Sequence, residues 1–414
     1  MKAEDLVKFY GEHPGVKEIF EGLQENSPQR ISLRGLTGSV RSFVNASVFQ
    51  EQHVLHLFIL QEKEQAAYFY NDLQNILAEQ EAPAETRKVL FFPTSYKRPY
   101  EIEKTDNANV LARTEVLKRI NSQSRKLLVV TYPEALSERV VQKKYLRKNT
   151  LKIETGDELS IDFVTDLLLE YEFERVDFVT EPGQFSLRGG IVDVFSYGND
   201  YPYRIEFFDE EIESIRTFNP EDQLSVTNLK KLTIIPNVQD RRMEEKRTSF
   251  ISYLPDSAII WGESFNFLKE RIDREFDKAK EAYQKLQGEI DHQPPDILFC
   301  SGDAFIKDYE SHHLIETGKN FFDFTDKEID FNTKPQPSFN KNFELLIEDL
   351  QNNSAQGIQN YIFAENPKQL NRLSTIFEDI QNRNGESKPI QFQPIASAIH
   401  EGFIDHELKV AFYT

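Results

Sequence analysis

Short apolar runs alternate with amphipathic segments through residues 30–133 of the chain. The runs have the length of buried strands, and the segments between them place apolar side chains on one helical face. Strands are predicted at Arg30–Leu33, Val54–Leu60, Lys88–Pro93 and Lys126–Pro133, with helices at Ser39–Gln50, Glu62–Gln80 and Asn107–Ile120. Because parallel strands joined by helices are covered on both faces, the alternation predicts an α/β domain with a parallel sheet over residues 1–149.

The pattern changes near Thr150, where one helix is followed by several strand signals in succession. The helix is predicted at Ser160–Phe173, and the strands at Arg175–Thr180, Gly183–Gly190, Ile191–Gly198, Tyr203–Asp209 and Glu211–Phe218. These strands are short, rich in β-branched and aromatic residues, and separated by turn residues. A tight turn is expected at Asp209–Glu210, and Gly189–Gly190 is expected to mark a bulge or a close approach of the backbone. Residues 150–236 are therefore predicted to form a small α+β domain inserted into the first.

The α/β pattern returns over residues 237–330, which are expected to complete the interrupted domain. A strand is predicted at Ser257–Ser264, a long helix at Phe265–Ile290 and another strand at Pro295–Cys300. The polar, proline-containing residues 331–340 are predicted to be a linker. Residues 341–414 alternate helix and strand again, which predicts a third, small α/β domain. Since the sequence stops within an apolar run, it is expected to be a fragment of a longer protein.

Composition narrows the functional classes. The 414 residues carry a formal net charge of −20, so a protein partner is favoured over a general nucleic-acid binder. A single cysteine, Cys300, cannot form a disulfide within the chain or a cysteine-based metal site, which fits a reducing cytoplasm. No apolar stretch has the length of a membrane span, so no membrane association is expected. His312 and His313 are adjacent and do not converge as metal ligands, so no metal site is predicted.

The first strand leads into a loop that resembles an incomplete phosphate-binding loop. The pattern G-x-x-x-x-G-K-[ST], placed on Gly35, requires glycine and lysine where the chain has Val40 and Arg41. Gly38 and Ser42 remain, and the hydroxyl of Ser42 is of the type that ligates magnesium. A β-branched side chain at 40 obstructs close backbone approach, and a forked guanidinium does not replace a compact ammonium.

The acidic pair that would accompany such a loop is also incomplete. Gly262 stands where the metal-holding aspartate is expected, followed by Glu263. No catalytic residues and no cofactor are therefore predicted. Weak, non-catalytic nucleotide binding stays open, as does a loop kept only to join its strand and helix.

Two motifs in the inserted domain carry a resemblance to a known family. Residues 183–195 read GQFSLRGGIVDVF, and residues 204–215 read RIEFFDEEIESI. They resemble the module of the excision-repair helicase UvrB that binds the damage sensor UvrA. The order of the domains also resembles UvrB, whose core is a P-loop, RecA-like helicase domain. The arginine at 41 and a short segment after the sequence FFP, with only Tyr96 and Tyr100, depart from UvrB. They are similar instead to the N-terminal UvrB-like region of the bacterial transcription-repair coupling factor (Mfd).

The resemblance implies a partner and a site. Arg175 and Arg188 would contact UvrA, while a third UvrB arginine falls at Ser186. Phe185 and Phe195 would add apolar contact, or else pack in the core. A salt bridge from Arg188, for example to Glu206, is the alternative for that arginine.

The resemblance further implies a longer protein that is an ATP-dependent DNA translocase. Its motor and its contacts with RNA polymerase and DNA would lie toward the C-terminus, outside this chain. A C-terminal domain of the same protein would mask the UvrA surface.

Two other functions stay open. A basic stretch, Arg139–Lys152, could neutralise DNA phosphates, although it could equally be a solvated connection into the inserted domain. A UvrB-like ATP-dependent helicase fragment is the other alternative, and the substitutions at positions 41 and 262 stand against it.

Overall fold

The structure is a computed structural model of the 414-residue chain. It describes residues 2–25, 27–80, 82–83, 86–95, 99–100, 107–122, 126–236, 247–286, 293–318, 325–384 and 390–414. Among these residues, no helix is long and apolar enough to cross a membrane.

A seven-stranded sheet forms the centre of the molecule, and every neighbouring pair of its strands is parallel. Its strands, in spatial order, are β17 (Lys327–Asp330), β1 (Arg30–Arg34), β16 (His313–Thr317), β15 (Ile259–Glu263), β2 (His56–Ile59), β4 (Leu128–Thr131) and β3 (Val89–Phe91). The apolar runs predicted over residues 30–133 are four of its strands, β1, β2, β3 and β4. Strands β2 and β4 are buried throughout. The predicted α/β class is confirmed.

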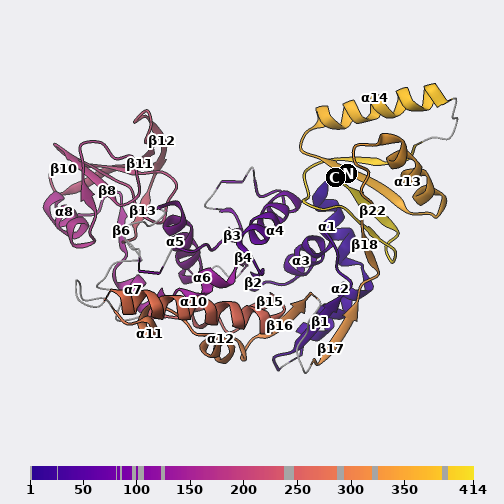
Figure 1. The fold of residues 1–414 in the computed structure, drawn as a ribbon. Helices are drawn as coiled ribbons and strands as arrows, with labels where there is room; N and C mark the ends of the chain where they lie inside the picture. Colours follow the sequence, from indigo (N-terminus) through magenta and orange to yellow (C-terminus); the bar gives the residue numbers. More distant parts are fainter. Residues whose placement is uncertain are drawn as a thin grey trace.

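Two groups of helices cover this sheet (Figure 1). One group contains α1 (Ala3–Gly11), α2 (Pro14–Leu23), α3 (Val40–Glu51) and α4 (Lys63–Ile76). The other contains α6 (Pro133–Ser137), α9 (Phe250–Tyr253), α10 (Phe265–Lys285), α11 (Pro295–Leu298) and α12 (Gly302–Tyr309). Helix α5 (Asn107–Asn121) packs beside β3. The long helix α10 buries one apolar stripe and exposes its charged face.

The inserted domain interrupts this fold between β4 and β15. Its six-stranded sheet has the order β12-β11-β10-β9-β8-β7, antiparallel except for the pair of β7 with β8. The strands are β7 (Glu174–Arg175), β8 (Gln184–Arg188), β9 (Ile191–Val194), β10 (Tyr203–Phe208), β11 (Glu211–Phe218) and β12 (Ser225–Leu229), with helix α8 at Ile161–Glu170.

Two strand pairs join the inserted domain to the core. The chain leaves through β5 (Val140–Val141), α7 (Lys143–Lys148) and β6 (Leu151–Glu154). It returns through β13 (Lys231–Ile234), which pairs with β6, and β14 (Arg247–Thr248), which pairs with β5. Departure and return therefore run side by side, as an insertion requires.

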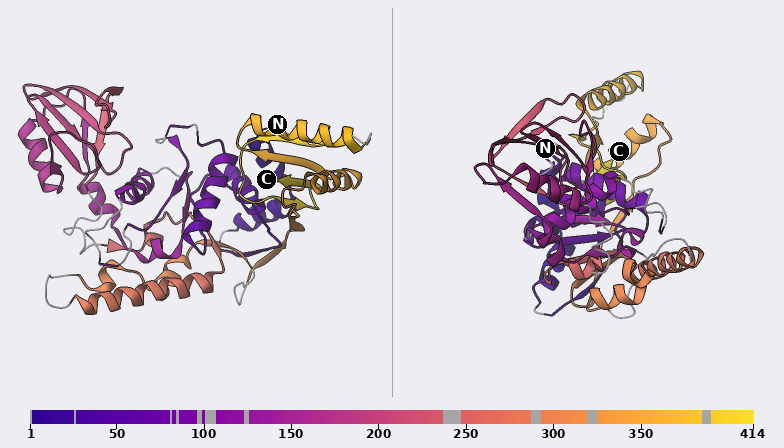
Figure 2. Two further views of the ribbon diagram at one scale, coloured as in Figure 1. Left: turned by 45° about the horizontal axis from the view of Figure 1, so that its top comes forward. Right: turned by 90° about the vertical axis from the view of Figure 1, so that its left-hand side faces the viewer.

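The last part of the chain forms a five-stranded mixed sheet with two helices. The sheet contains β18 (Thr333–Pro335), β21 (Phe403–Asp405), β22 (Val410–Tyr413), β19 (Gln359–Ala364) and β20 (Gln393–Ala396), in this order, with α13 (Phe343–Ala355) and α14 (Pro367–Asn384). Figure 2 shows it at the opposite end of the central sheet from the inserted domain. The predicted linker at 331–340 is wrong in part, because Thr333–Pro335 is a strand of this sheet. The other domain boundaries stay predictions.

Two further local predictions are wrong. Pro295–Leu298 is the short helix α11, not a strand, because a four-residue apolar run fits either structure and proline at its start favours a helix. Gly189–Gly190 is the two-residue turn between β8 and β9 rather than a bulge. The alternative of a close backbone approach holds at Gly190, where a Cβ would lie 3.0 Å from the carbonyl oxygen of Phe207. Gly189 has a φ of 61°, a value that such turns require and that glycine adopts without strain.

Candidate functional site

Arg188 lies at the end of β8, and a buried carboxylate of the neighbouring strand holds its side chain. Its Nη2 group donates to Oδ2 of Asp193, which is 1% exposed. Arg204 of β10 donates to the same carboxylate from Nε, at 2.7 Å, and from Nη2, at 2.8 Å. The alternative of a salt bridge from Arg188 to a neighbouring strand is confirmed, but its partner is Asp193 and not Glu206, whose side chain pairs with Arg216.

This arrangement leaves positive charge at the surface. The guanidinium groups of Arg188 and Arg204 share the one carboxylate of Asp193, so these three side chains together carry a net charge of +1. The side chain of Arg188 is 42% exposed. The hydrogen bonds that Arg204 donates to Asp193 raise the pKa of Arg204. Arg188 is thus positioned by Asp193 and still presents N–H donors for a carboxylate of a partner.

An exposed aromatic ring lies against this guanidinium. Phe178 is 60% exposed, and the central guanidinium carbon of Arg188 lies 5.2 Å from its ring centroid. The sequence does not single out Phe178, because the alternation after β7 does not show which apolar side chain points outward. Phe178 and Arg188 together are called the Arg–Phe patch below.

Arg175 belongs to the edge strand β7, where it is exposed and pairs with Phe185 in the parallel register. No described contact joins Arg175 to Arg188. The structure therefore brings Arg188 and Phe178 together, and places Arg175 three positions before Phe178 on the same edge segment.

The two predicted phenylalanines are not at the surface. Phe185 is fully buried, and Phe195 is 5% exposed in a small cluster with Val179 and Phe218. The expected apolar contact of Phe185 and Phe195 with a partner is wrong for this structure, because packing removes both rings from solvent. Ser186 is also buried, with its hydroxyl donating to the backbone carbonyl of Asp177.

The incomplete phosphate-binding loop follows β1, at the position where such loops occur in α/β proteins. Gly35 and Gly38 have φ values of 75° and 55°, so both glycines are required by the backbone. A Cβ atom at Gly35 would lie 1.9 Å from the carbonyl oxygen of Phe331. Val40, at the start of α3, is fully buried. The loop therefore packs tightly against the chain itself.

The polar side chains predicted for this site, Arg41, Ser42 and Glu263, all have partners within the chain. Nη1 of Arg41 lies 3.3 Å from Oε2 of Glu263, and both side chains are mostly buried. The hydroxyl of Ser42 donates to Oδ2 of Asp72 at 3.2 Å. A Cβ at Gly262 would lie 2.7 Å from ring carbons of Phe265, so an acidic side chain has no room there. Whether the site binds nucleotide stays a prediction.

The basic stretch Arg139–Lys152 is spread over several elements. Arg139 donates to the carbonyl of Phe299, and Arg147 donates to the side chain and carbonyl of Asn121. Arg147 and Lys152, together with Lys118 and Lys231, line a cavity of about 510 Å³ at the base of the inserted domain. Arg139 and Arg147 of the basic stretch therefore make hydrogen bonds within the chain.

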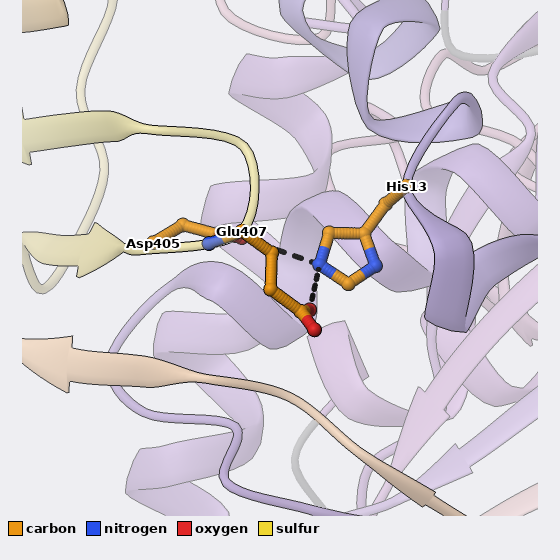
Figure 3. Close-up of side chains that lie close together, drawn as sticks. All are labelled: His13, Asp405 and Glu407. Atoms are coloured by element: carbon orange, nitrogen blue, oxygen red, sulfur yellow. Dashed lines mark hydrogen bonds and ion pairs between the residues drawn. The ribbon is translucent and has the colours of Figure 1, made fainter. Parts of the chain in front are cut away.

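Among the described residues, one group has donor atoms close enough to hold a metal ion: His13, Asp405 and Glu407 (Figure 3). Nε2 of His13 lies 2.8 Å from Glu407 and 3.7 Å from Asp405. Nδ1 of His13 accepts a hydrogen bond from the backbone N–H of Gly15, so the proton of the neutral ring is on Nε2. Nε2 of His13 thus lies at ion-pair distance from both carboxylates, and the group joins the start of α2 to the turn between β21 and β22.

The fold and a family match together define the class. Residues 151–239 match the family described as the UvrB interaction domain, which covers the inserted sheet and its strand-paired base. The chain thus has a UvrB-like α/β core interrupted by a segment that matches a protein-interaction domain.

Within this class, the sequence is similar to transcription-repair-coupling factors. The Bacillus subtilis protein of that name is 31% identical over 251 residues, which cover 58% of this chain and 20% of the relative. The Borreliella burgdorferi protein is 23% identical over 418 residues, covering 91% of this chain and 36% of the relative. UvrABC system protein B of Thermosipho africanus is 27% identical over 249 residues, with 57% and 36% covered.

These matches confirm the predicted resemblance to the UvrB-like N-terminal region of the coupling factor. The chain spans between a fifth and about a third of the length of these relatives.

Proposed function

We propose that this chain is the non-catalytic, UvrB-like N-terminal region of a transcription-repair coupling factor. It recruits UvrA to RNA polymerase stalled at DNA damage and so directs nucleotide excision repair to that site. RNA polymerase and DNA are contacted by other regions of the longer protein, which is an ATP-dependent translocase. A C-terminal domain of that protein masks the UvrA surface until it is released.

The observation that supports this proposal is the Arg–Phe patch on a segment that matches the UvrB interaction domain. A guanidinium that a buried carboxylate holds in place loses little side-chain entropy on binding. An exposed ring beside it supplies apolar area, and arginine and aromatic residues are enriched among the residues that dominate binding energy. A carboxylate-bearing partner surface fits this patch.

The incomplete nucleotide site supports a role in binding rather than hydrolysis. Arg41 pairs with Glu263, and the space where a metal-holding side chain would stand is filled by Phe265. No side chain at 262 is then available to hold a metal ion beside a triphosphate.

The proposal is tested by measuring the affinity of the whole chain for purified UvrA. Arg188→Ala and Phe178→Ala are each expected to weaken binding about tenfold or more, as truncation of a dominant interface residue does. Arg34→Ala is the matched control, since Arg34 is 47% exposed and pairs with Glu328 on the distant edge of the central sheet. Equal affinities for Arg188→Ala, Phe178→Ala and the parent chain would remove the Arg–Phe patch from the interface.

A further inference from the structure

We propose that the incomplete phosphate-binding loop is a docking site for the last domain, and that the turn Ile399–Gly402 is its resident occupant. A carbonyl oxygen of this turn takes the position in which such a loop holds a phosphate oxygen. This contact is separate from the Arg–Phe patch and does not depend on UvrA binding.

The backbone of the loop bonds directly to the turn. The N–H of Ser39, at the start of α3, donates to the carbonyl of Glu401 at 3.1 Å. The N–H of Glu401 donates back to the hydroxyl of Ser39 at 3.0 Å. A Cβ at Gly38 would lie 3.0 Å from the carbonyl oxygen of Gly402, so the glycine permits this close approach. Helix N-termini favour negative charge, and here a carbonyl dipole meets that preference.

A buried carboxylate fastens the same turn. Asp72 of α4 is 3% exposed and accepts from the backbone N–H of His400 at 2.7 Å. It also accepts from the hydroxyls of Ser39, at 2.6 Å, and Ser42, at 3.2 Å. The hydroxyl of Ser42, which would ligate magnesium in a working loop, is thus already bonded to Asp72. The contact between residues 35–42, Asp72 and the turn Ile399–Gly402 is called the joint below. Burial raises the pKa of Asp72, and these hydrogen bonds oppose that rise.

The other side of the loop is occupied as well. The N–H of Thr37 donates to the hydroxyl of Thr333, on strand β18 of the last sheet, at 3.2 Å. That hydroxyl also donates to the carbonyl of Gly35. At the surface, the ring of Tyr68 stacks on His400 with 3.7 Å between ring centroids. Residues 35–42 therefore meet two separate parts of the last domain.

A phosphate and this turn compete for the same donor. The N–H of Ser39 cannot bond the Glu401 carbonyl and a phosphate oxygen with full strength, and the backbone of Gly402 lies where a ligand would approach. The loop therefore keeps its glycines because the joint needs them, although nucleotide chemistry is lost.

Hydrogen–deuterium exchange on the whole chain tests this inference. The amides of His400 and Glu401 are expected to be protected in the parent protein. In Asp72→Ala they should exchange at least about tenfold faster, because the fastening hydrogen bonds are lost. Asp166→Ala, at an exposed position of α8, is the control and should leave both amides unchanged. The amides of β10 report in every variant whether the rest of the chain stays folded.

A second variant, Tyr68→Ala, and the addition of ATP or phosphate to the parent protein complete the experiment. Tyr68→Ala removes an exposed ring from the joint without emptying the core, and it should speed exchange at His400 by a smaller factor. Millimolar ATP with magnesium, or inorganic phosphate, should not change exchange at residues 398–402 of the parent. Unprotected amides in the parent, an unchanged Asp72→Ala variant, or displacement of the turn by ATP or phosphate would each overturn the inference.

Discussion

At the incomplete phosphate-binding loop, side chains of the chain itself pair with one another: Arg41 with Glu263, and Ser42 with Asp72. Arg188 was predicted from sequence as an exposed contact, and the structure exposes it. Phe178 and Asp193 were missed, since no pattern in the sequence reveals which carboxylate a guanidinium will meet. For Phe185 and Phe195 the sequence leaves partner contact and core packing both open, because alternation identifies two faces of a strand without showing whether both are covered, and the structure packs both rings in the core.

Restoring an acidic residue at 262 is expected to destabilise the chain. In Gly262→Asp, the added Cβ would lie 2.7 Å from the ring of Phe265, which is fully buried. Overpacking of this kind costs roughly 1–3 kcal/mol, measurable as a lower free energy of unfolding in urea. Gly11→Asp is the control, because a Cβ there meets nothing within 4 Å. Undiminished stability of Gly262→Asp would show that the site has room for a metal-holding side chain.

His56 is expected to make the chain less stable in mild acid. Full burial, and then the charge of Lys126, lowers the pKa of His56 to about 3 from its ordinary 6.5. Nδ1 of His56 accepts from the indole N–H of Trp261 at 3.1 Å, which fits the neutral ring. Between these pKa values the unfolded chain binds the proton more tightly, so this contribution to stability falls as pH drops below about 6.5.

The slope due to this one group approaches about 1.4 kcal/mol per pH unit within that window. Unfolding of the parent and of His56→Gln in urea at pH 7 and pH 5 measures it. The variant should lose less stability between the two pH values than the parent does. Equal losses would assign the acid sensitivity to other groups.

At the scale of elements, the apolar runs of the central sheet are predicted as strands from the sequence, whereas β16 is not. Strand β16 lies between β1 and β15 in the central sheet, yet it begins with His313 and contains Glu316. Glu316 is buried because its carboxylate accepts the backbone N–H of Phe265 at 2.8 Å. A helix N-terminus far along the chain therefore satisfies this residue, and local pattern cannot anticipate it.

The turn between β8 and β9 positions the Arg–Phe patch. Gly189 has a positive φ, and an added Cβ would meet nothing within 4 Å, so its requirement for glycine is purely conformational. Gly189→Val is expected to cost about 1–2 kcal/mol of stability and to weaken UvrA binding, because Arg188 is adjacent. Gly189→Asn should be milder, since asparagine tolerates this conformation. Thermal unfolding and UvrA titration of both variants measure the difference, and equal behaviour would contradict the assigned turn.

At the scale of the whole molecule, the order of the domains stays a prediction, made from the change in the period of the apolar pattern near Thr150 and again near residue 237. The packing of the last domain against the first could not be predicted from the sequence. It depends on contacts between residues 35–42 and residues 399–402, which are distant in sequence and unremarkable in composition. The predicted linker failed for the same reason, since β18 is defined only by its pairing with β21.

The central claim is that this chain presents to UvrA the surface that UvrB would otherwise use. Competition between the two proteins tests it most directly: labelled chain is bound to purified UvrA, and unlabelled UvrB is titrated in. The account predicts that UvrB displaces the chain fully and that the Arg188→Ala variant is displaced at lower UvrB concentration. A stable complex in which UvrA holds UvrB and the chain at the same time, with no loss of labelled chain, would contradict it.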